Sequence, residues 1–352
     1  MARVEAAGQA HAPGERPKAT WPILATLGIA LILIALGSAA IGSVPLSPSA
    51  ILGALGLGPA ADDITRTIVL QVRLPRIALA AVVGIALAAS GTVLQGLFRN
   101  PMADPYIIGV SAGAALGATA AIVFGFTYSV LGVSGVSLTA FAAALLVTLL
   151  VYRLAWFRGE VVVEHLLLAG VAVGAFLAAI ISALQLLGGE SLQQVIFWLM
   201  GGFAGRTWPH VLLTMPYVVA GYLIAWALAR DLNLLVLGDE TAQSLGAQPG
   251  RVRGALIAAA ALMASAAVAA SGLIGFVGLI VPHLMRLVVG PDHRRLLPAA
   301  ALAGGSTMLI ADAVARSAAA PGEIPVGIVT AVLGAPFFLY LLRTQRRRTY
   351  WS

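Results

Sequence analysis

Long apolar runs without charged residues alternate with short polar segments along this chain. A helix needs about 20 predominantly apolar residues to cross a bilayer. The pattern therefore predicts ten membrane-spanning helices joined by short connections. Their expected ranges are 21–41, 77–98, two helices within 105–152 that divide near 127–136, 166–187, 211–228, 255–270, 273–289, 298–315 and 324–342. A further apolar stretch, 195–203, is too short to span and predicts an interfacial or re-entrant helix.

The first apolar run allows two interpretations, because Arg16 and Lys18 precede it as basic residues precede a signal peptide. The apolar core of a signal peptide is usually about 7–15 residues long. The run 21–41 is longer than that. We therefore favour a retained first helix over a cleaved segment.

Composition and charge support this assignment and exclude a soluble globular enzyme. Of 352 residues, 60% are hydrophobic and 10% are charged, whereas soluble domains carry about 25% charged residues. The net charge of +7 suggests basic cytoplasmic loops rather than a nucleic-acid partner. With the N-terminus inside, 16 of the 21 Lys and Arg residues fall on the cytoplasmic side. The outside exceptions are Arg66, Arg73, Arg76, Arg206 and Arg316.

The residues needed for several kinds of chemistry are missing. A phosphate-binding Walker A loop needs a lysine after a glycine-rich turn, and the only lysine, Lys18, follows Arg16 and Pro17. Cysteine is absent, and the five histidines show no metal-ligand spacing. Charged or titratable residues deep in the predicted spans are few: His283, Arg286 and Asp312. We therefore expect no catalytic residues, no metal site and no cofactor in this chain, and any ATP hydrolysis must occur in another chain.

The longest polar cytoplasmic segment, 230–253, predicts two short helices, Leu232–Leu237 and Asp239–Leu245, with Asp239 as the N-cap of the second. Its apolar residues lie where water is available, which suggests a protein partner. The alternative is an amphipathic helix on the lipid surface. Such helices favour basic polar faces, whereas this one presents Asp239 and Glu240. We therefore favour the protein partner.

Motifs along the chain carry a resemblance to a known family. They are RLPR at 73–76, GLFRNPMADPYIIGVSAGAALG at 96–117, LLLAGVAVG at 166–174, FWLMGGFAG at 197–205, LNLLVLGDETAQSLG at 232–246, GLIGFVGLIVPHLMRL at 272–287, GPDHRRLLP at 290–298 and EIPVGIVTAVLGAPFFLYLL at 323–342. Together they resemble the permease subunits of ATP-driven importers for iron–siderophores, haem and vitamin B12. The resemblance covers about residues 20–345.

The resemblance implies an all-α, polytopic membrane protein with ten helices and both termini cytoplasmic, in the inner membrane. Two copies would form a homodimer around a central pathway. Two ATP-binding cassette subunits, which hold ATP and Mg²⁺, would bind the cytoplasmic face, and a soluble binding protein would deliver the metal chelate outside. The expected organisation is a cytoplasmic tail at 1–19, one permease domain at 20–345 and a tail at 346–352.

Three sets of site residues follow from the resemblance. The polar segment is similar to the coupling helices that contact the ATPase, with Leu237, Gly238, Asp239, Glu240, Ala242, Leu245 and Gly246. In the family, arginines on the outer rim of the permease contact glutamates of the binding protein. The matching positions in this chain are Arg73, Arg76 and Arg316. The alternative for these arginines is anchoring to lipid headgroups.

The cytoplasmic gate of the family lies in two loops. The first matches Asn100 and Met102, although Asn100 could instead cap the chain beside Pro101. The second falls at Val163 and Glu164, where relatives carry small hydroxyl residues. This departure leaves the chemistry of the second gate segment open.

Two other classes of protein were weighed against an import permease. A secondary transporter or channel is disfavoured by the scarcity of intramembrane carboxylates and by the coupling-like segment. A membrane enzyme is disfavoured because no catalytic constellation is recognisable. The identity of the chelate stays open, because siderophore, haem and cobalamin permeases share these motifs.

Overall fold

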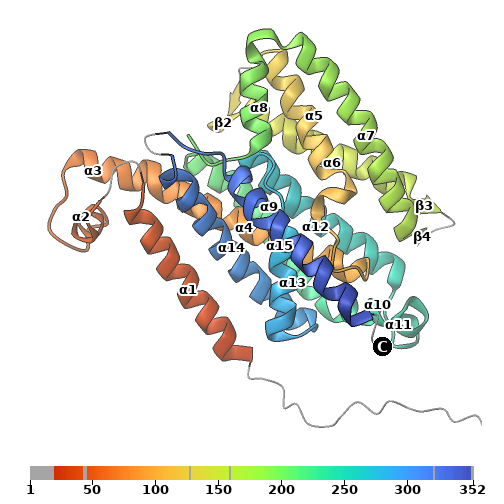
Figure 1. The fold of residues 1–352 in the computed structure, drawn as a ribbon. Helices are drawn as coiled ribbons and strands as arrows, with labels where there is room; N and C mark the ends of the chain where they lie inside the picture. Colours follow the sequence, from red (N-terminus) through yellow and green to blue (C-terminus); the bar gives the residue numbers. More distant parts are fainter. Residues whose placement is uncertain (1–19, 43–45, 127, 158–159, 320–321, 350–352) are drawn as a thin grey trace, which may run out of the picture.

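The fold was examined in a computed structural model, which describes residues 20–42, 46–126, 128–157, 160–319 and 322–349. The predicted tail at 1–19 lies outside the described residues, whereas the tail expected from 346 begins inside a helix that continues to Thr349. Helices make up almost all of the regular structure, and the strands in the described ranges form two short antiparallel hairpins. The all-α fold class is therefore confirmed (Figure 1).

The helices and strands follow one another in a simple order. They are α1 Thr20–Ala40, α2 Pro48–Ala54, α3 Asp63–Thr67, the π-helix η1 Ile68–Arg73, α4 Leu74–Leu97, η2 Pro105–Ile108, α5 Val110–Val123, β1 Ser129–Val130, β2 Val133–Ser134, α6 Gly135–Leu154, β3 Trp156–Phe157, β4 Glu160–Val161, α7 Val163–Leu187, η3 Gly189–Ser191, α8 Leu192–Met200, α9 Trp208–Ala227, α10 Ala229–Leu237, α11 Asp239–Ser244, α12 Pro249–Ser271, α13 Val277–Val289, α14 His293–Ser317 and α15 Val326–Thr349.

Seven helices in the described ranges are long and apolar enough to cross a membrane. Three shorter apolar helices complete the set: Val110–Val123, Val277–Val289 and Val326–Tyr340. These segments fall at the ten positions that the hydropathy pattern predicts. The stretch predicted to be too short to span forms α8, a helix of 9 residues.

Several predicted spans begin at other residues than the helices do, and two of these differences affect the site. The second span was expected to begin at Ile77, but continuous helix runs from Asp63 to Leu97, so Arg73 and Arg76 lie within helical structure. The eighth span was expected from Leu273, but the chain is not helical until Val277. Gly272 and Phe276 have φ angles of +71° and +70°, which break the path between α12 and α13.

The centre of the molecule is helix α4, which packs against α9, α12, α13 and α14. Small residues allow the backbones to approach closely, as is common between helices in lipid. A Cβ atom at Gly84 would lie 2.3 Å from the carbonyl oxygen of Gly304, and one at Gly91 would lie 1.8 Å from that of Gly278. Helices α5, α6 and α7 form a second group beside this centre (Figure 1).

Candidate functional site

The predicted coupling segment forms two short helices separated by a sharp turn. Helix α10 ends at Leu237, Gly238 adopts a φ of +122°, and α11 follows directly. Leu237 and Leu245 are 65% and 57% exposed, whereas Ala242 is fully buried. The segment is therefore fixed to the bundle through one face of α11 and presents apolar side chains at both ends.

The role predicted for Asp239 as an N-cap is wrong. Gly238 occupies the N-cap position of α11, and no side chain caps this helix. The Asp239 carboxylate instead accepts hydrogen bonds from Nη2 of Arg253 at 2.8 and 2.9 Å, and it lies 3.5 Å from Nη2 of Arg99. Glu240 is exposed. The two acidic residues thus differ: Asp239 faces the protein, and Glu240 faces outward.

The partners of Asp239 connect the coupling segment to both predicted gate segments. Arg99 immediately precedes Asn100, and its guanidinium also donates to the carbonyl of Leu235 at 2.7 Å. Arg253 donates to the carbonyl of Val161 at 3.4 Å, two residues before Val163. Side-chain contacts therefore link α11 to the loop after α4 and to the strand before α7.

The first gate segment is held by local hydrogen bonds. The side-chain oxygen of Asn100 accepts from the backbone N–H of Met102 at 2.9 Å, so the capping role weighed for Asn100 is present. Farther along, the Tyr106 hydroxyl donates to the carbonyl of Ile274 at 2.8 Å and accepts from its N–H at 2.9 Å. This loop is therefore tied to the break between α12 and α13, a contact that the sequence analysis missed.

The second gate segment lies at the start of α7. Val163 is half-buried and Glu164 is exposed in the first turn of that helix. An acidic side chain is favourable there, because the N-terminus of a helix carries partial positive charge. The structure thus gives Glu164 a local stabilising position, and its part in gating stays a prediction.

The three arginines predicted to dock a binding protein are buried rather than free on a rim. Arg73, Arg76 and Arg316 are 6%, 8% and 5% exposed. Arg76 binds Asp312 through Nε at 3.0 Å and Nη2 at 2.9 Å, and it binds Glu323 through Nη1 at 2.9 Å. The sequence pattern marks Asp312 as a deep charge but does not reveal these partners.

The remaining contacts of these arginines reach the first helix. Arg316 Nε lies 3.0 Å from the fully buried Asp312 carboxylate, and its Nη2 donates to the Ser38 hydroxyl at 2.7 Å. Arg73 donates to the carbonyl of Ala39. The cluster joins α1, α4, α14 and the chain before α15. The exposure assumed for these arginines is therefore corrected: their charge is largely used inside the chain.

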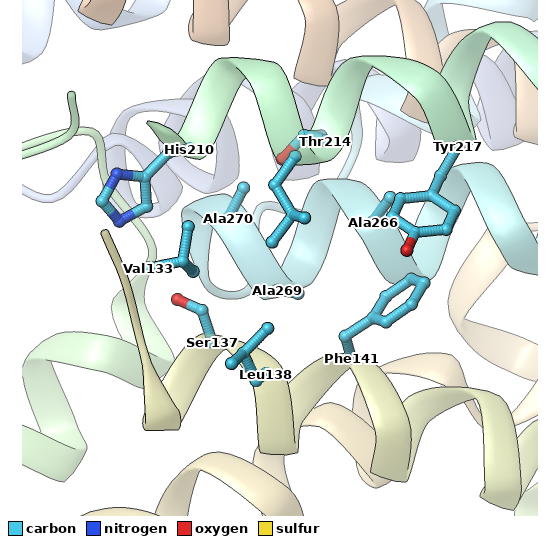
Figure 2. A pocket seen from close by; sticks show the side chains of 11 residues that line it. Val133, Ser137, Leu138, Phe141, His210, Thr214, Tyr217, Ala266, Ala269 and Ala270 are labelled. Carbon is cyan, nitrogen blue, oxygen red and sulfur yellow. The ribbon is translucent and has the colours of Figure 1, made fainter. Parts of the chain in front are cut away.

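In the part of the chain that the structure describes, two of the cavities lie away from the coupling segment. A pocket of about 70 Å³ lies between α6, α9 and α12, and Figure 2 shows His210 at one end and the Phe141 and Tyr217 rings at the other. A water molecule occupies about 30 Å³ in the liquid, so this pocket is too small for a chelate. A cavity of about 340 Å³ lies between α8, the loop after it, the end of α12 and the start of α15. In the described part of the chain, no three His, Asp or Glu side chains gather to hold a metal ion.

Comparison with known proteins identifies the family. A model of the FecCD transport family matches residues 29–344. The chain belongs to this family. It is 48% identical to the cobalamin import system permease protein of Halobacterium salinarum, covering 87% of this chain and 82% of that protein.

The names of other similar permeases state other cargoes. The hemin transport system permease protein of Yersinia pestis is 41% identical over 93% of this chain and 96% of its own length. The Fe(3+)-citrate import system permease protein of Bacillus subtilis is 40% identical over 93% of this chain and 97% of its own length. A solved inward-facing structure of a metal-chelate type ABC transporter superposes with a TM-score of 0.81 at 38% identity, covering 92% of this chain and 99% of that one. The chain is thus a multi-pass membrane permease, and the resemblance seen in its motifs is confirmed.

Proposed function

We propose that this chain is the membrane-spanning subunit of an ATP-driven importer that moves a metal chelate into the cytoplasm by alternating access. Membership of the FecCD transport family supports the import of a chelate. The relatives named above transport cobalamin, hemin or ferric citrate, and all three are metal-bearing complexes. We therefore propose a metal chelate as the cargo of this chain, without choosing among the three.

The observation that carries the proposal is the position of Asp239. Its carboxylate joins the exposed coupling segment to Arg99 and Arg253, and those arginines lead to the two gate segments. A partner that binds Leu237 and Leu245 and displaces α11 would therefore move the two gate segments through short, charge-assisted contacts. Coupling of this kind is a free-energy link between the nucleotide state of the partner and the state of the pathway.

The proposed partners follow from this arrangement. Two ATP-binding cassette subunits would hold ATP and Mg²⁺ and perform the hydrolysis, so the chain itself is not an enzyme. A second copy of the chain would complete the pathway. We place the chain in the inner membrane with both termini in the cytoplasm, which the distribution of basic residues supports.

Docking of a soluble binding protein at Arg73, Arg76 and Arg316 stays a prediction. Asp312 and Glu323 already hold Arg76, and Asp312 also holds Arg316. Carboxylates of a docking protein would therefore have to displace internal carboxylates. Glu323 is the accessible member of the cluster, with 35% of its side chain exposed.

The proposed function is tested by reconstitution with a candidate ATPase. The full chain and the ATPase are assembled in lipid nanodiscs, and ATP turnover is measured with and without chelate-loaded binding protein. We expect a stable complex whose turnover rises when the loaded binding protein is added. A chain that transports a chelate in vesicles without associating with any ATPase would overturn the proposal.

A further inference from the structure

The cavity of about 340 Å³ beside α8 contains an unbalanced positive charge. Three charged side chains line it: Arg76, Arg206 and Glu323. Arg76 is compensated, because it binds both Glu323 and the buried Asp312 at 2.9 Å. Arg206 has no carboxylate partner among the described residues. It therefore remains the uncompensated cation of the cavity wall.

The hydrogen bonds of Arg206 are also incomplete. Its Nε is buried and has no acceptor in the described part of the chain. Its Nη1 lies 3.3 Å from Nε2 of His210, while the backbone N–H of Thr207 points at Nδ1 of the same ring from 3.3 Å. A neutral imidazole has only one acceptor nitrogen, so His210 accepts from Arg206 only in the tautomer whose Nδ1 donates to the Thr207 hydroxyl, 3.2 Å away. Burial without a carboxylate lowers the pKa of Arg206.

A second hydrogen-bond donor, on a residue that lines the same cavity, has no partner. The indole Nε1 of Trp198 is buried and meets no acceptor in the described ranges. An indole N–H can only donate, and so can a guanidinium. A buried donor without an acceptor costs about 1–3 kcal/mol. The two groups that the protein leaves unsatisfied here are both donors, so the missing component is an acceptor.

We propose that Arg206 and Trp198 form an oxyanion subsite that engages a carboxylate or phosphodiester group of the arriving chelate. This inference rests on the proposed function and gives one chemical requirement for its cargo. A binding cavity for a whole ligand of drug size usually measures about 300–1,000 Å³. At the lower end of that range, this cavity accommodates one arm of a large chelate while the rest occupies the pathway.

The position of the subsite suits an early step of import. Arg206 lies two residues before α9, and the coupling segment begins just after that helix ends. Helix α9 has 20 residues, which corresponds to about 30 Å at 1.5 Å per residue. The subsite and the coupling segment therefore lie at opposite ends of the bundle (Figure 1). An anion bound at Arg206 would therefore lie far from the gate segments.

Two pairs of probes test for recognition of an oxyanion, and in the second pair the sugar and base attached to it are removed as well. Haemin carries two carboxylates, and haemin dimethyl ester has the same ring without them. Cyanocobalamin carries a phosphodiester, and cobinamide lacks the nucleotide loop that contains it. Equilibrium binding of each probe is measured on the full chain in phosphatidylcholine nanodiscs, after subtraction of binding to nanodiscs without protein. We expect the oxyanion-bearing member of at least one pair to bind about tenfold more tightly, because charge-assisted hydrogen bonds are the stronger ones. The pair that discriminates tells a carboxylate from a phosphodiester.

Variants assign that preference to the cavity. Arg206→Gln should bring the affinity ratio of the discriminating pair close to one, and Arg206→Lys should restore part of it. Trp198→Phe keeps an aromatic side chain, although a smaller one, and removes the donor, so a fall of about threefold in the ratio is expected. Arg66→Gln is the matched control, because it removes an exposed arginine that does not line the cavity. Gel filtration in detergent verifies that each variant is folded.

Specific outcomes would overturn the subsite. These are equal binding within both pairs by the unaltered chain, or a ratio that survives Arg206→Gln. A third is an Arg206→Gln variant that no longer dimerises but keeps the affinity ratio. In that case Arg206 would bind an acceptor on a second copy of the chain rather than on the chelate. Association with the ATPase does not involve Arg206. If the complex assembles and hydrolyses ATP, but Arg206→Gln leaves the affinity ratio unchanged, the subsite alone is refuted. If the chain binds no ATPase at all, the proposed function is refuted.

Discussion

The carboxylate of Asp239 lies 2.8 Å from Nη2 of Arg253, and this contact joins helix α11 to helix α12. The Arg253 side chain is 10% exposed and that of Asp239 is 37% exposed, so the pair lies at the boundary between the bundle and its surface. Arg99 approaches the same carboxylate at 3.5 Å from the loop after α4. One acidic side chain therefore links three elements: α11, α12 and the loop after α4.

Replacement of Asp239 by Asn should uncouple the permease. The substitution keeps the size of the side chain but removes the charge, and Arg253 then remains mostly buried without a carboxylate. We expect the free energy of unfolding to fall by about 1–3 kcal/mol. ATP turnover by an assembled complex should continue while chelate uptake per ATP falls several-fold. Thermal unfolding and paired measurements of turnover and uptake test this expectation.

Glu240→Gln is the matched control for that experiment. It removes the neighbouring carboxylate in the same helical turn, but the Glu240 side chain is exposed. Exposed charges contribute little to stability, so unfolding should be unchanged. If both variants unfold and transport alike, the Asp239 link has no special role.

Attachment of the ATPase should depend on the outward face of the segment. Glu240→Lys combined with Leu237→Ser and Leu245→Ser alters exposed residues while leaving the buried Ala242 in place. We expect the permease to remain folded and its affinity for the ATPase to fall at least tenfold, measured by co-purification at graded concentrations. Glu190→Lys alters an exposed acidic residue in η3 and serves as the control. Full retention of the ATPase by the triple variant would contradict the assignment.

The hydropathy pattern predicted the ten apolar segments because span length and the absence of charge are local properties of the chain. It could not predict the break at Gly272–Phe276, since an apolar sequence does not reveal the φ angle of a residue such as Phe276. The partners of Asp239 were equally hidden. Arg99 is distant from Asp239 in sequence, and Arg253 lies beyond the turn that follows α11. Only the packing of α4, α11 and α12 brings the three side chains together.

The outer arginines illustrate the same limit. Arg73 and Arg76 belong to the RLPR motif at 73–76, but the sequence did not reveal that Asp312 and Glu323 would neutralise Arg76. The spacing of Asp312 and Arg316 by four residues was a usable signal, because residues at that spacing face each other on a helix. Hydropathy alone, by contrast, marks Asp312 only as an isolated deep charge.

Neutralisation of Asp312 should destabilise the bundle strongly. Asp312→Asn leaves Arg76 and Arg316 in a buried site without their shared carboxylate, and breaking a buried pair costs about 3–5 kcal/mol. We expect a large fall in the unfolding temperature in detergent. Glu323→Gln, at the exposed edge of the same cluster, should cost less than about 1 kcal/mol.

The same cluster offers a sharp test of docking. If Arg76 serves mainly within the chain, Arg76→Gln should lower the unfolding temperature together with the affinity for a binding protein. If it serves mainly in docking, affinity should fall while the unfolding temperature stays constant. We expect the first result, measured by thermal unfolding and by titration of the binding protein onto nanodiscs.

The hydroxyl of Tyr106 should stabilise the gate loop. It both donates to and accepts from the backbone of Ile274, at 2.8 and 2.9 Å. Tyr106→Phe removes both bonds while keeping the ring, and we expect a loss of about 1–3 kcal/mol in unfolding free energy, since the N–H and carbonyl of Ile274 lose their partner. Hydrogen exchange at 272–276 should speed up as well. Unchanged exchange there would show that the hydroxyl does not hold the break in place.

Gly91→Ala should prevent the close contact between α4 and α13. The added Cβ would lie 1.8 Å from the carbonyl oxygen of Gly278, and both groups belong to backbone that cannot rotate away. The helices would have to separate, and overpacking of this kind costs about 3 kcal/mol. We expect little monodisperse protein and a lowered unfolding temperature. Gly28→Ala in α1 is the control, because nothing lies within 4 Å of a Cβ there. Equal behaviour of the two variants would mean that α4 and α13 pack less tightly than the structure indicates.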